Sequence, residues 1–242
     1  MAGSLFFPVL GVILSNALYF APLPAVYRAQ KLGSIGSLNP LPVALMVVST
    51  NAWMCYALAV PNGFIVASNL PGAIAAVAFV AITLPLIPRE MAYARTQVQM
   101  VLVLGASATL LLWTTLIFLE LGHDARCFWL GAYGSAICVL LFASPLSTMR
   151  EVLATSNAVS IYAPLTFAQV TNCAMWTIYG LGIGDIWVWG PNSTGLMLGL
   201  VQLGLKLVFP SGPRKAEEQR MFLKEATSDR GSDDDGNGEP MA

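Results

Sequence analysis

Two asparagines and two tryptophans recur at one spacing along the chain. Asn69 and Asn192 lie 123 residues apart, as do Trp53 and Trp176. A carboxamide offers both donors and an acceptor, which suits the hydroxyl groups of a neutral polyol, and flat aromatic faces suit the apolar C–H faces of a sugar ring. Singly, such residues also bond neighbouring helices or mark a membrane interface. Because all four are duplicated, we expect a binding site for a neutral ligand.

The elements that must position these side chains are membrane-spanning helices. Of the 242 residues, 56% are apolar and only 10% are charged, whereas a soluble domain usually carries about 25% charged residues. A helix needs about 20 apolar residues to cross the bilayer core, and open sheet edges are not viable in lipid. We therefore predict an all-α membrane protein with seven spans, at residues 5–27, 40–60, 63–87, 98–120, 127–149, 160–182 and 186–209.

The charged residues predict the orientation of these spans. In a seven-span chain, eleven of the 12 basic residues fall on one side of the membrane and only Arg126 falls on the other. The positive-inside rule then places the N-terminus outside and the C-terminus in the cytosol. Residues 211–242 hold eight of the 13 acidic residues, and their composition predicts a disordered cytosolic tail. We expect the plasma membrane, with an organellar membrane as the alternative.

An internal repeat organises the spans. The 123-residue spacing also relates four further identical pairs: Gly11 and Gly134, Pro22 and Pro145, Tyr56 and Tyr179, and Gly72 and Gly195. These matches predict parallel three-helix units joined by a linker helix, with chain segments 1–97, 98–120, 121–210 and 211–242. Because each unit and the linker have an odd number of spans, both units insert the same way up, and a substrate site is expected on their shared axis near the midplane.

The membrane-embedded part of the chain lacks residues typical of an enzyme or a coupled pump. Residues 1–210 contain no GxxxxGK[ST] loop, so ATP is not the driving ligand. The single histidine, His123, lies in a predicted outside loop, and the four cysteines lack the spacing of a zinc site. The carboxylates of this segment lie at or beside predicted span ends: Glu90, Glu120, Asp124, Glu151 and Asp185. A proton-coupled carrier usually needs an ionisable group deep in its pathway. We expect a non-enzymatic uniporter of a neutral solute, with no cofactor or metal.

Prolines in the spans predict points of bending. Pro22, Pro40, Pro145 and Pro164 fall inside the predicted spans. Proline removes a backbone N–H and clashes with the preceding turn, so it kinks a helix. Kinks in both units would let their cytosolic ends swing, although packing irregularity is an equal alternative.

Four segments of the sequence resemble the SWEET sugar transporters, a family with parallel repeats. They are YFAPLPAVYR (19–28), FASPLSTMREV (142–152), NCAMWTIYG (172–180) and WGPNSTGLMLGLVQLGL (189–205). The resemblance covers residues 5–209 and is strongest in the second unit. It implies bidirectional sugar uniport by alternating access, and it implies that the protein forms homo-oligomers in the lipid bilayer.

The resemblance also implies roles for individual residues. The central sugar-binding quartet would be Asn69, Asn192, Trp53 and Trp176. The pocket wall would be formed by Ser15, Leu18, Ser49, Leu140 and Asn172. The hinges would be Pro22, Pro40, Pro145 and Pro164, and the extracellular gate would include Tyr56 and Asp185.

The size of two wall residues bears on the substrate. Leu140 and Asn172 are larger than the small residues often found in disaccharide carriers of the family, which implies a narrower pocket and a monosaccharide such as glucose. Two alternatives remain open: a proton-coupled carrier of amino acids or other small solutes of the related PQ-loop type, and a non-transporting seven-span receptor or scaffold. A net charge of −1 gives no indication of nucleic-acid binding.

Overall fold

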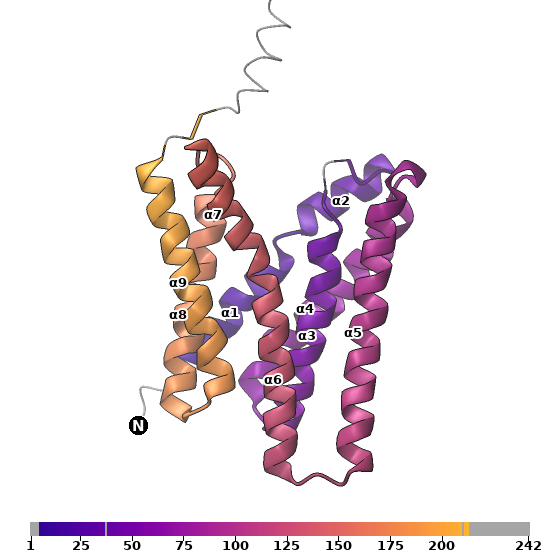
Figure 1. Cartoon of the computed structure of the whole chain (residues 1–242), viewed down its shortest axis with the longest axis vertical. Coiled ribbons are helices and arrows are strands. Elements are labelled where there is room, and N and C mark those ends of the chain that lie inside the picture. Colours follow the sequence, from indigo (N-terminus) through magenta and orange to yellow (C-terminus); the bar gives the residue numbers. More distant parts are fainter. Residues whose placement is uncertain (1–4, 37, 210, 213–242) are drawn as a thin grey trace, which may run out of the picture.

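A computed structural model describes residues 5–36, 38–209 and 211–212. Within these ranges the elements are α1 (Phe6–Phe20), α2 (Leu23–Leu32), α3 (Leu41–Ala59), α4 (Gly63–Thr83), α5 (Ala92–Phe118), α6 (His123–Leu141), α7 (Ala143–Thr155), α8 (Ala163–Ile183), α9 (Ile186–Val208), and two short 3₁₀ turns at Leu84–Leu86 and Arg89–Met91. Because α2 continues α1 and α7 continues α6, these helices form seven rods (Figure 1). Of the tail predicted at 211–242, residues 213–242 lie outside the described part of the chain.

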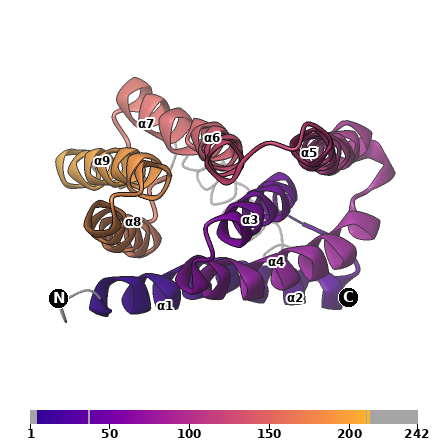
Figure 2. The same ribbon diagram turned by 90° about the horizontal axis from the view of Figure 1, so that it is seen from below.

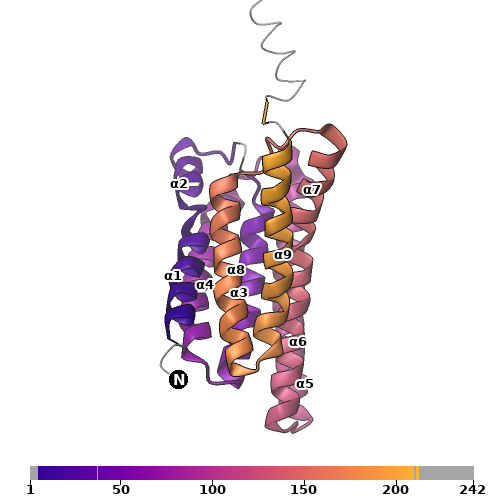
Figure 3. The same ribbon diagram turned by 90° about the vertical axis from the view of Figure 1, so that its left-hand side faces the viewer.

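The seven rods match the seven predicted spans to within a few residues at most ends. Five of them are long and apolar enough to cross a membrane by length and composition: Phe6–Leu32, Leu41–Ala59, Gly63–Leu86, Arg89–Phe118 and His123–Thr155. The other two, α8 and α9, are 21 and 23 residues long and lie alongside the rest (Figure 3). Both helices carry polar side chains, among them Asn172 in α8 and Asn192 in α9.

The two three-helix units have the same internal order. In the first, α4 contacts both α1 and α3; in the second, α9 contacts both α8 and α6. The third helix of each unit therefore lies between the first and the second. Across the units α1 packs against α8, and α3 packs against α6, so each first helix meets the second helix of the other unit (Figure 2). The linker helix α5 lies at the outside of the bundle, mainly against α3.

The third helix of each unit begins at an equivalent side-chain cap. The Asn62 side-chain oxygen accepts hydrogen bonds from the N–H groups of Phe64 and Ile65, at 3.1 and 3.3 Å. Asp185 does the same for the second and third residues that follow it, at 3.0 and 3.3 Å. These side chains satisfy backbone donors that a helix start leaves unpaired. The caps fix where α4 and α9 begin, at the same end of the bundle.

The prolines fall into three structural classes. Pro22 and Pro145 lie at the α1–α2 and α6–α7 junctions, where each rod is interrupted as predicted. Pro40 and Pro164, by contrast, lie at the starts of α3 and α8. The prediction that these two lie inside spans and kink them is wrong, because a proline in the first turn replaces an N–H that has no helical partner.

The prolines inside α4 and α9 are Pro71 and Pro191. A proline inside a helix leaves the carbonyl four residues earlier without its partner. For Pro71 this carbonyl belongs to Ala67, and it accepts a hydrogen bond from Asn16 Nδ2 of α1 at 3.2 Å. A side chain of the first helix thus compensates for the proline of the third.

The described basic residues separate between the two ends of the bundle. The end formed by α2, α7 and the last turn of α9, here called the basic face, carries Arg28, Lys31, Arg89, Arg95, Arg150 and Lys206 (Figure 1). The opposite end, where the chain turns from α3 to α4, α5 to α6 and α8 to α9, carries Arg126. The other five basic residues lie beyond residue 212, outside the described part.

Candidate functional site

A cavity of about 630 Å³ lies between the two three-helix units. It begins at Ile65 and Val188, near the starts of α4 and α9, and extends to Pro22 and Pro145 and to Gln202 near the end of α9. The cavity therefore runs from the middle of the bundle toward the basic face. Its position between equivalent helices is where a site on the repeat axis was expected.

All four duplicated residues line this cavity. Trp53 and Trp176 reach it from α3 and α8, and Asn69 and Asn192 reach it from α4 and α9. The lining also includes four of the five wall residues that the resemblance implies. Ser15, Leu18 and Ser49 belong to the first unit, and Asn172 belongs to the second. The structure thus brings together residues that are up to 177 positions apart in the sequence.

The tryptophan of each unit is held by the first helix of the other unit. Trp176 Nε1 donates to Ser15 Oγ at 3.0 Å, and Trp53 Nε1 donates to Cys138 Sγ at 3.3 Å. Ser15 and Cys138 are themselves 123 residues apart. Ser15 Oγ in turn donates to Asn172 Oδ1 at 2.9 Å. Each indole ring is therefore fixed across the interface between the units.

Glycines of the first helices make room for these rings. A Cβ atom at Gly11 would lie 3.0 Å from Trp176 Cε2, and a Cβ atom at Gly134 would lie 3.6 Å from the Trp53 ring. The first distance is tighter than ordinary van der Waals contact and the second is within its usual range. Gly11 and Gly134 are one of the repeated pairs in the sequence. In the structure each lies against the tryptophan ring of the other unit.

Two tyrosine contacts close the end of the cavity that is far from the basic face. The Tyr56 hydroxyl donates to both Asp185 carboxylate oxygens at 2.8 Å. At the equivalent place Asn62 Nδ2 donates to the Tyr179 hydroxyl at 3.0 Å. In each case a tyrosine of one unit binds the helix-capping residue of the other. The resemblance assigned Tyr56 and Asp185 to a gate, and the structure places them in direct contact.

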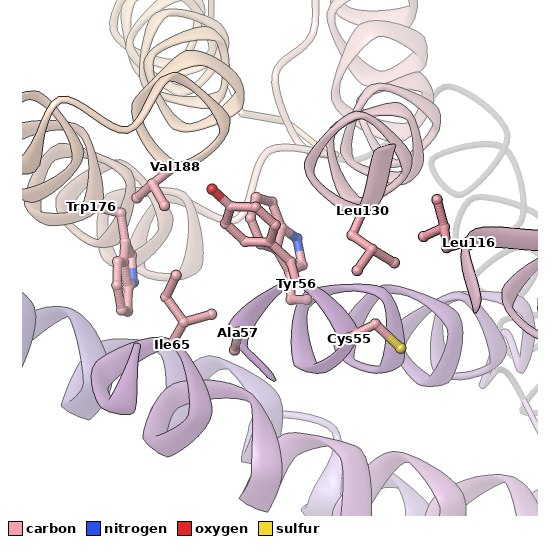
Figure 4. Close-up of a cluster of buried hydrophobic side chains, with 9 residues drawn as sticks. Cys55, Tyr56, Ala57, Ile65, Leu116, Leu130, Trp176 and Val188 are labelled. Carbon is pink, nitrogen blue, oxygen red and sulfur yellow. The ribbon is translucent and has the colours of Figure 1, made fainter. Parts of the chain in front are cut away.

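A buried apolar cluster lies at this end of the cavity. It contains Tyr56 together with the cavity-lining residues Trp53, Trp176, Ile65 and Val188, which come from both units (Figure 4). Ile65 and Val188 are again 123 residues apart. The cavity therefore extends from these apolar side chains toward the basic face.

The cavity lining is largely apolar and carries polar groups that are uncharged. Among the described residues that line it, hydroxyl, thiol, amide and aromatic side chains occur, and carboxylates and basic groups do not. The described part of the chain also contains no cluster of three or more residues that could hold a metal ion. This lining can exchange hydrogen bonds with a hydroxylated ligand, but it offers no counter-ion to a charged one.

One predicted wall residue lies outside the cavity. The Leu140 side chain is 62% exposed on the outer surface of α6, and the cavity is lined instead by Cys138 and Leu141 of the same helix. The prediction for Leu140 is therefore wrong in register. One position along an α-helix rotates a side chain by about 100°, which is enough to move it from the interior to the lipid-facing surface.

Two aromatic residues of the lining, Tyr19 and Phe142, were not predicted from the sequence. They are 123 residues apart, so applying the repeat spacing to every polar or aromatic residue, rather than to identical pairs alone, would have found them. Pro40 and Pro164 do not line the cavity, whereas Pro42 and Leu165 do.

Comparisons with known proteins agree with this architecture. The family model described as "Sugar efflux transporter for intercellular exchange" (MtN3/saliva) matches residues 5–89 and 128–214. The chain is 30% identical over 230 residues to the bidirectional sugar transporter NEC1 of Petunia hybrida, covering 94% of this chain and 84% of that protein. It is 28% identical over 208 residues to the bidirectional sugar transporter SWEET12 of Oryza sativa subsp. japonica, covering 86% and 68%.

A solved structure supports the same assignment. The fold matches a eukaryotic SWEET transporter determined at 3.7 Å resolution, with a TM-score of 0.72 and 25% identity, covering 82% of this chain and 93% of that one. Members of this family are transporters rather than enzymes. With its two matched repeats, its linker helix and its cavity between them, the chain belongs to the MtN3/SWEET family of sugar transporters.

Proposed function

We propose that this protein is a facilitative, bidirectional carrier of a neutral sugar. The observation that carries the proposal is the uncharged, hydrogen-bonding cavity between the tryptophan and asparagine pairs. Indole rings suit the apolar faces of a sugar, and amides suit its hydroxyl groups. The names of the relatives NEC1 and SWEET12, both bidirectional sugar transporters, support the same substrate class.

The transport mechanism that we propose is alternating access. The cavity is open toward the basic face, and the Tyr56–Asp185 and Asn62–Tyr179 contacts close the other end. Opening that end requires these contacts to break while the ends near the rod interruptions at Pro22 and Pro145 come together. Because no ion holds either state, the net flux follows the sugar gradient.

The proposed orientation places the basic face in the cytosol. The six described basic residues of that face, against Arg126 at the other end, support an outside N-terminus and a cytosolic C-terminus. The described state is then inward-open, in the plasma membrane. The segments 1–97 and 121–210 act as the two moving units, with 98–120 as the linker and a cytosolic tail from residue 211. The exposed apolar side chains of α5 are available to lipid or to a second copy in a homo-oligomer.

We propose a monosaccharide, such as glucose, as the preferred substrate. Leu141 and Asn172 narrow the cavity in the second unit. Asn172 is held in place by Ser15, so it cannot simply swing aside for a larger ligand. Leu141 occupies the position inside the cavity that was predicted for Leu140, so the same limit on ligand size applies there.

The proposal is tested by measuring uptake of labelled glucose and sucrose in transport-deficient cells that express the wild type or Asn192→Ala. Saturable glucose flux, lost in the variant at equal surface abundance, is the expected result. An absence of flux of both sugars from wild-type protein at the cell surface would exclude the proposed substrate class. It would direct attention to a carrier of a different solute.

A further inference from the structure

The two asparagines of the cavity differ although their helices are equivalent. In each unit the side-chain Nδ2 donates to the carbonyl four residues earlier. Asn69 Nδ2 lies 2.9 Å from the Ile65 oxygen, and Asn192 Nδ2 lies 2.8 Å from the Val188 oxygen. These bonds orient both amides alike, so any difference between them arises from the neighbouring side chains.

The remaining hydrogen-bonding groups of Asn69 are bound within the protein. Its Nδ2 also donates to Ser68 Oγ at 2.9 Å, and its Oδ1 accepts the Tyr19 hydroxyl at 3.0 Å. The residue is buried, with 6% of its surface exposed. The residues 123 positions after Ser68 and Tyr19 are Pro191 and Phe142, whose side chains cannot form hydrogen bonds.

The Asn192 side chain consequently keeps hydrogen-bonding groups that no protein atom occupies in the described part of the chain. It is half-buried and lines the cavity. Within the described part of the chain the only hydrogen bond of its side chain is the one to Val188, so Oδ1 and the second N–H of the amide remain unbound. A sugar hydroxyl both donates and accepts, and an amide that presents one acceptor beside one donor can bind it in both ways.

The packing of Tyr19 keeps its hydroxyl in place. Its ring lies directly against Gly72, one turn after Asn69, where a Cβ atom would collide with the ring. In the second unit Phe142 lies against Gly195, with Cε1 3.3 Å from the position of a Cβ atom there. The two rings therefore occupy corresponding places, and a hydroxyl group is the chemical difference between them.

We propose that Tyr19 is a specificity-determining residue that makes sugar binding asymmetric. Its hydroxyl withdraws the Asn69 oxygen from the ligand, so Asn192 provides the acceptor and donor for the sugar, and Asn69 serves as a fixed part of the wall. This inference rests on the proposed sugar transport and specifies which half of the repeat recognises the substrate.

The test is a reciprocal exchange of the hydroxyl. We expect Phe142→Tyr to raise the KM for glucose about tenfold, because the new hydroxyl occupies Asn192 Oδ1 and one hydrogen bond to the sugar is lost. We expect Tyr19→Phe to lower the KM two- to fivefold, about the gain from a freed acceptor. The double exchange should bring the KM below that of Phe142→Tyr alone, because the freed Asn69 oxygen then supplies an acceptor while Ser68 still holds the second N–H of Asn69. Surface abundance is measured for each variant.

A second readout does not depend on transport. In detergent without sugar, Tyr19→Phe should lower the melting temperature, because the bond to Asn69 is lost, and Phe142→Tyr should not. Phe142→Tyr with wild-type KM, a rise in KM for Tyr19→Phe, or a double exchange whose KM is no lower than that of Phe142→Tyr would each overturn the asymmetric assignment. A melting shift without any sugar flux in the wild type would leave the hydrogen bond in place and refute both the sugar function and the role of Asn192 in it.

Discussion

Trp176 and Ser15 are joined by a hydrogen bond of 3.0 Å between the indole N–H and the serine oxygen. The two residues are 161 positions apart and belong to different units. The bond orients the indole ring against which the sugar is proposed to lie. The Ser15 hydroxyl also donates a hydrogen bond to Asn172 Oδ1. The positions of Trp176 and Asn172 in the second unit therefore depend on a hydroxyl of the first.

Ser15→Ala should weaken sugar binding. Removal of the Ser15 hydroxyl leaves the buried Trp176 N–H and the Asn172 oxygen without this partner. The loss of a buried hydrogen bond of this kind costs about 1–2 kcal/mol. We expect the KM for glucose to rise about five- to twentyfold, which radiotracer uptake would measure. The matched control is Ser15→Cys, because a thiol already serves the equivalent bond between Trp53 and Cys138. Equal effects of alanine and cysteine would contradict this role.

Gly11→Ala should damage the carrier more than Gly134→Ala. A methyl group at Gly11 would lie 3.0 Å from Trp176, whereas one at Gly134 would lie 3.6 Å from Trp53. Overpacking costs about 1–3 kcal/mol, while replacing glycine by alanine inside a helix gains about 1 kcal/mol. Thermal melting in detergent should therefore show a loss for Gly11→Ala and no loss for Gly134→Ala. The reverse order would refute the packing argument.

Tyr56→Phe should favour opening at the end opposite the basic face. It removes the hydroxyl that binds Asp185 at 2.8 Å while keeping the ring in the apolar cluster. With the protein in intact cells, labelling of the cavity cysteines Cys138 and Cys173 by a membrane-impermeant thiol reagent should increase severalfold. Cys127 lies near this end, so the measurement uses Cys127→Ser as its background. Unchanged labelling would mean that this contact does not hold the end closed.

Asp185→Asn should be tolerated better than Asp185→Ala. Asparagine at the equivalent position, Asn62, both caps its helix and binds Tyr179, so the amide can serve both purposes. Alanine loses the cap and the tyrosine contact together, and a lost cap alone costs about 1 kcal/mol. We expect a lower melting temperature and altered uptake for alanine only. Equal loss for both substitutions would show that the negative charge itself is required.

Leu141→Val combined with Asn172→Ser should improve sucrose transport relative to glucose. Both changes remove volume from the second-unit wall. Leu140→Val with Asn172→Ser is the matched control, because Leu140 lies on the outer surface of α6. Competition of labelled glucose uptake by sucrose gives the ratio. The size argument for a monosaccharide fails if the two double variants behave alike.

Uptake should not follow an imposed pH gradient. The described residues that line the cavity include no carboxylate or basic side chain, so no group there can carry a proton with the sugar. Initial rates with the outside more acidic or more alkaline than the inside should agree within about twofold. Accumulation of sugar driven by a proton gradient would instead favour the proton-coupled alternative.

The sequence predicted the helices and the repeat well, and for physical reasons. Hydrophobic length sets where a chain can cross a bilayer, so the spans could be placed to within a few residues. Tryptophan, asparagine and proline are uncommon enough that pairs at one spacing reveal a duplication. These features were sufficient to bring Trp53, Trp176, Asn69 and Asn192 into one predicted site, and the cavity contains all four.

The missed features depend on contacts between the units. Spacing within the sequence does not reveal that Cys138 faces Trp53, or that Tyr19 reaches Asn69, because these pairs form only when helices pack. The error at Leu140 has a different origin, since a shift of one position turns a side chain by about 100° around the helix axis. The N-cap roles of Asn62 and Asp185 required the ends of the helices to be known to a single residue.

The packing of each tryptophan against a glycine of the other unit has a consequence for genetics. A bulky substitution at Gly11 would displace Trp176 first. A mutation near the beginning of the chain should therefore disturb the structure around a residue near its end. Suppressors of such a lesion should then be sought among the neighbours of Trp176 rather than among those of Gly11. A substitution in one half of the chain is therefore expected to need a compensating change in the other half.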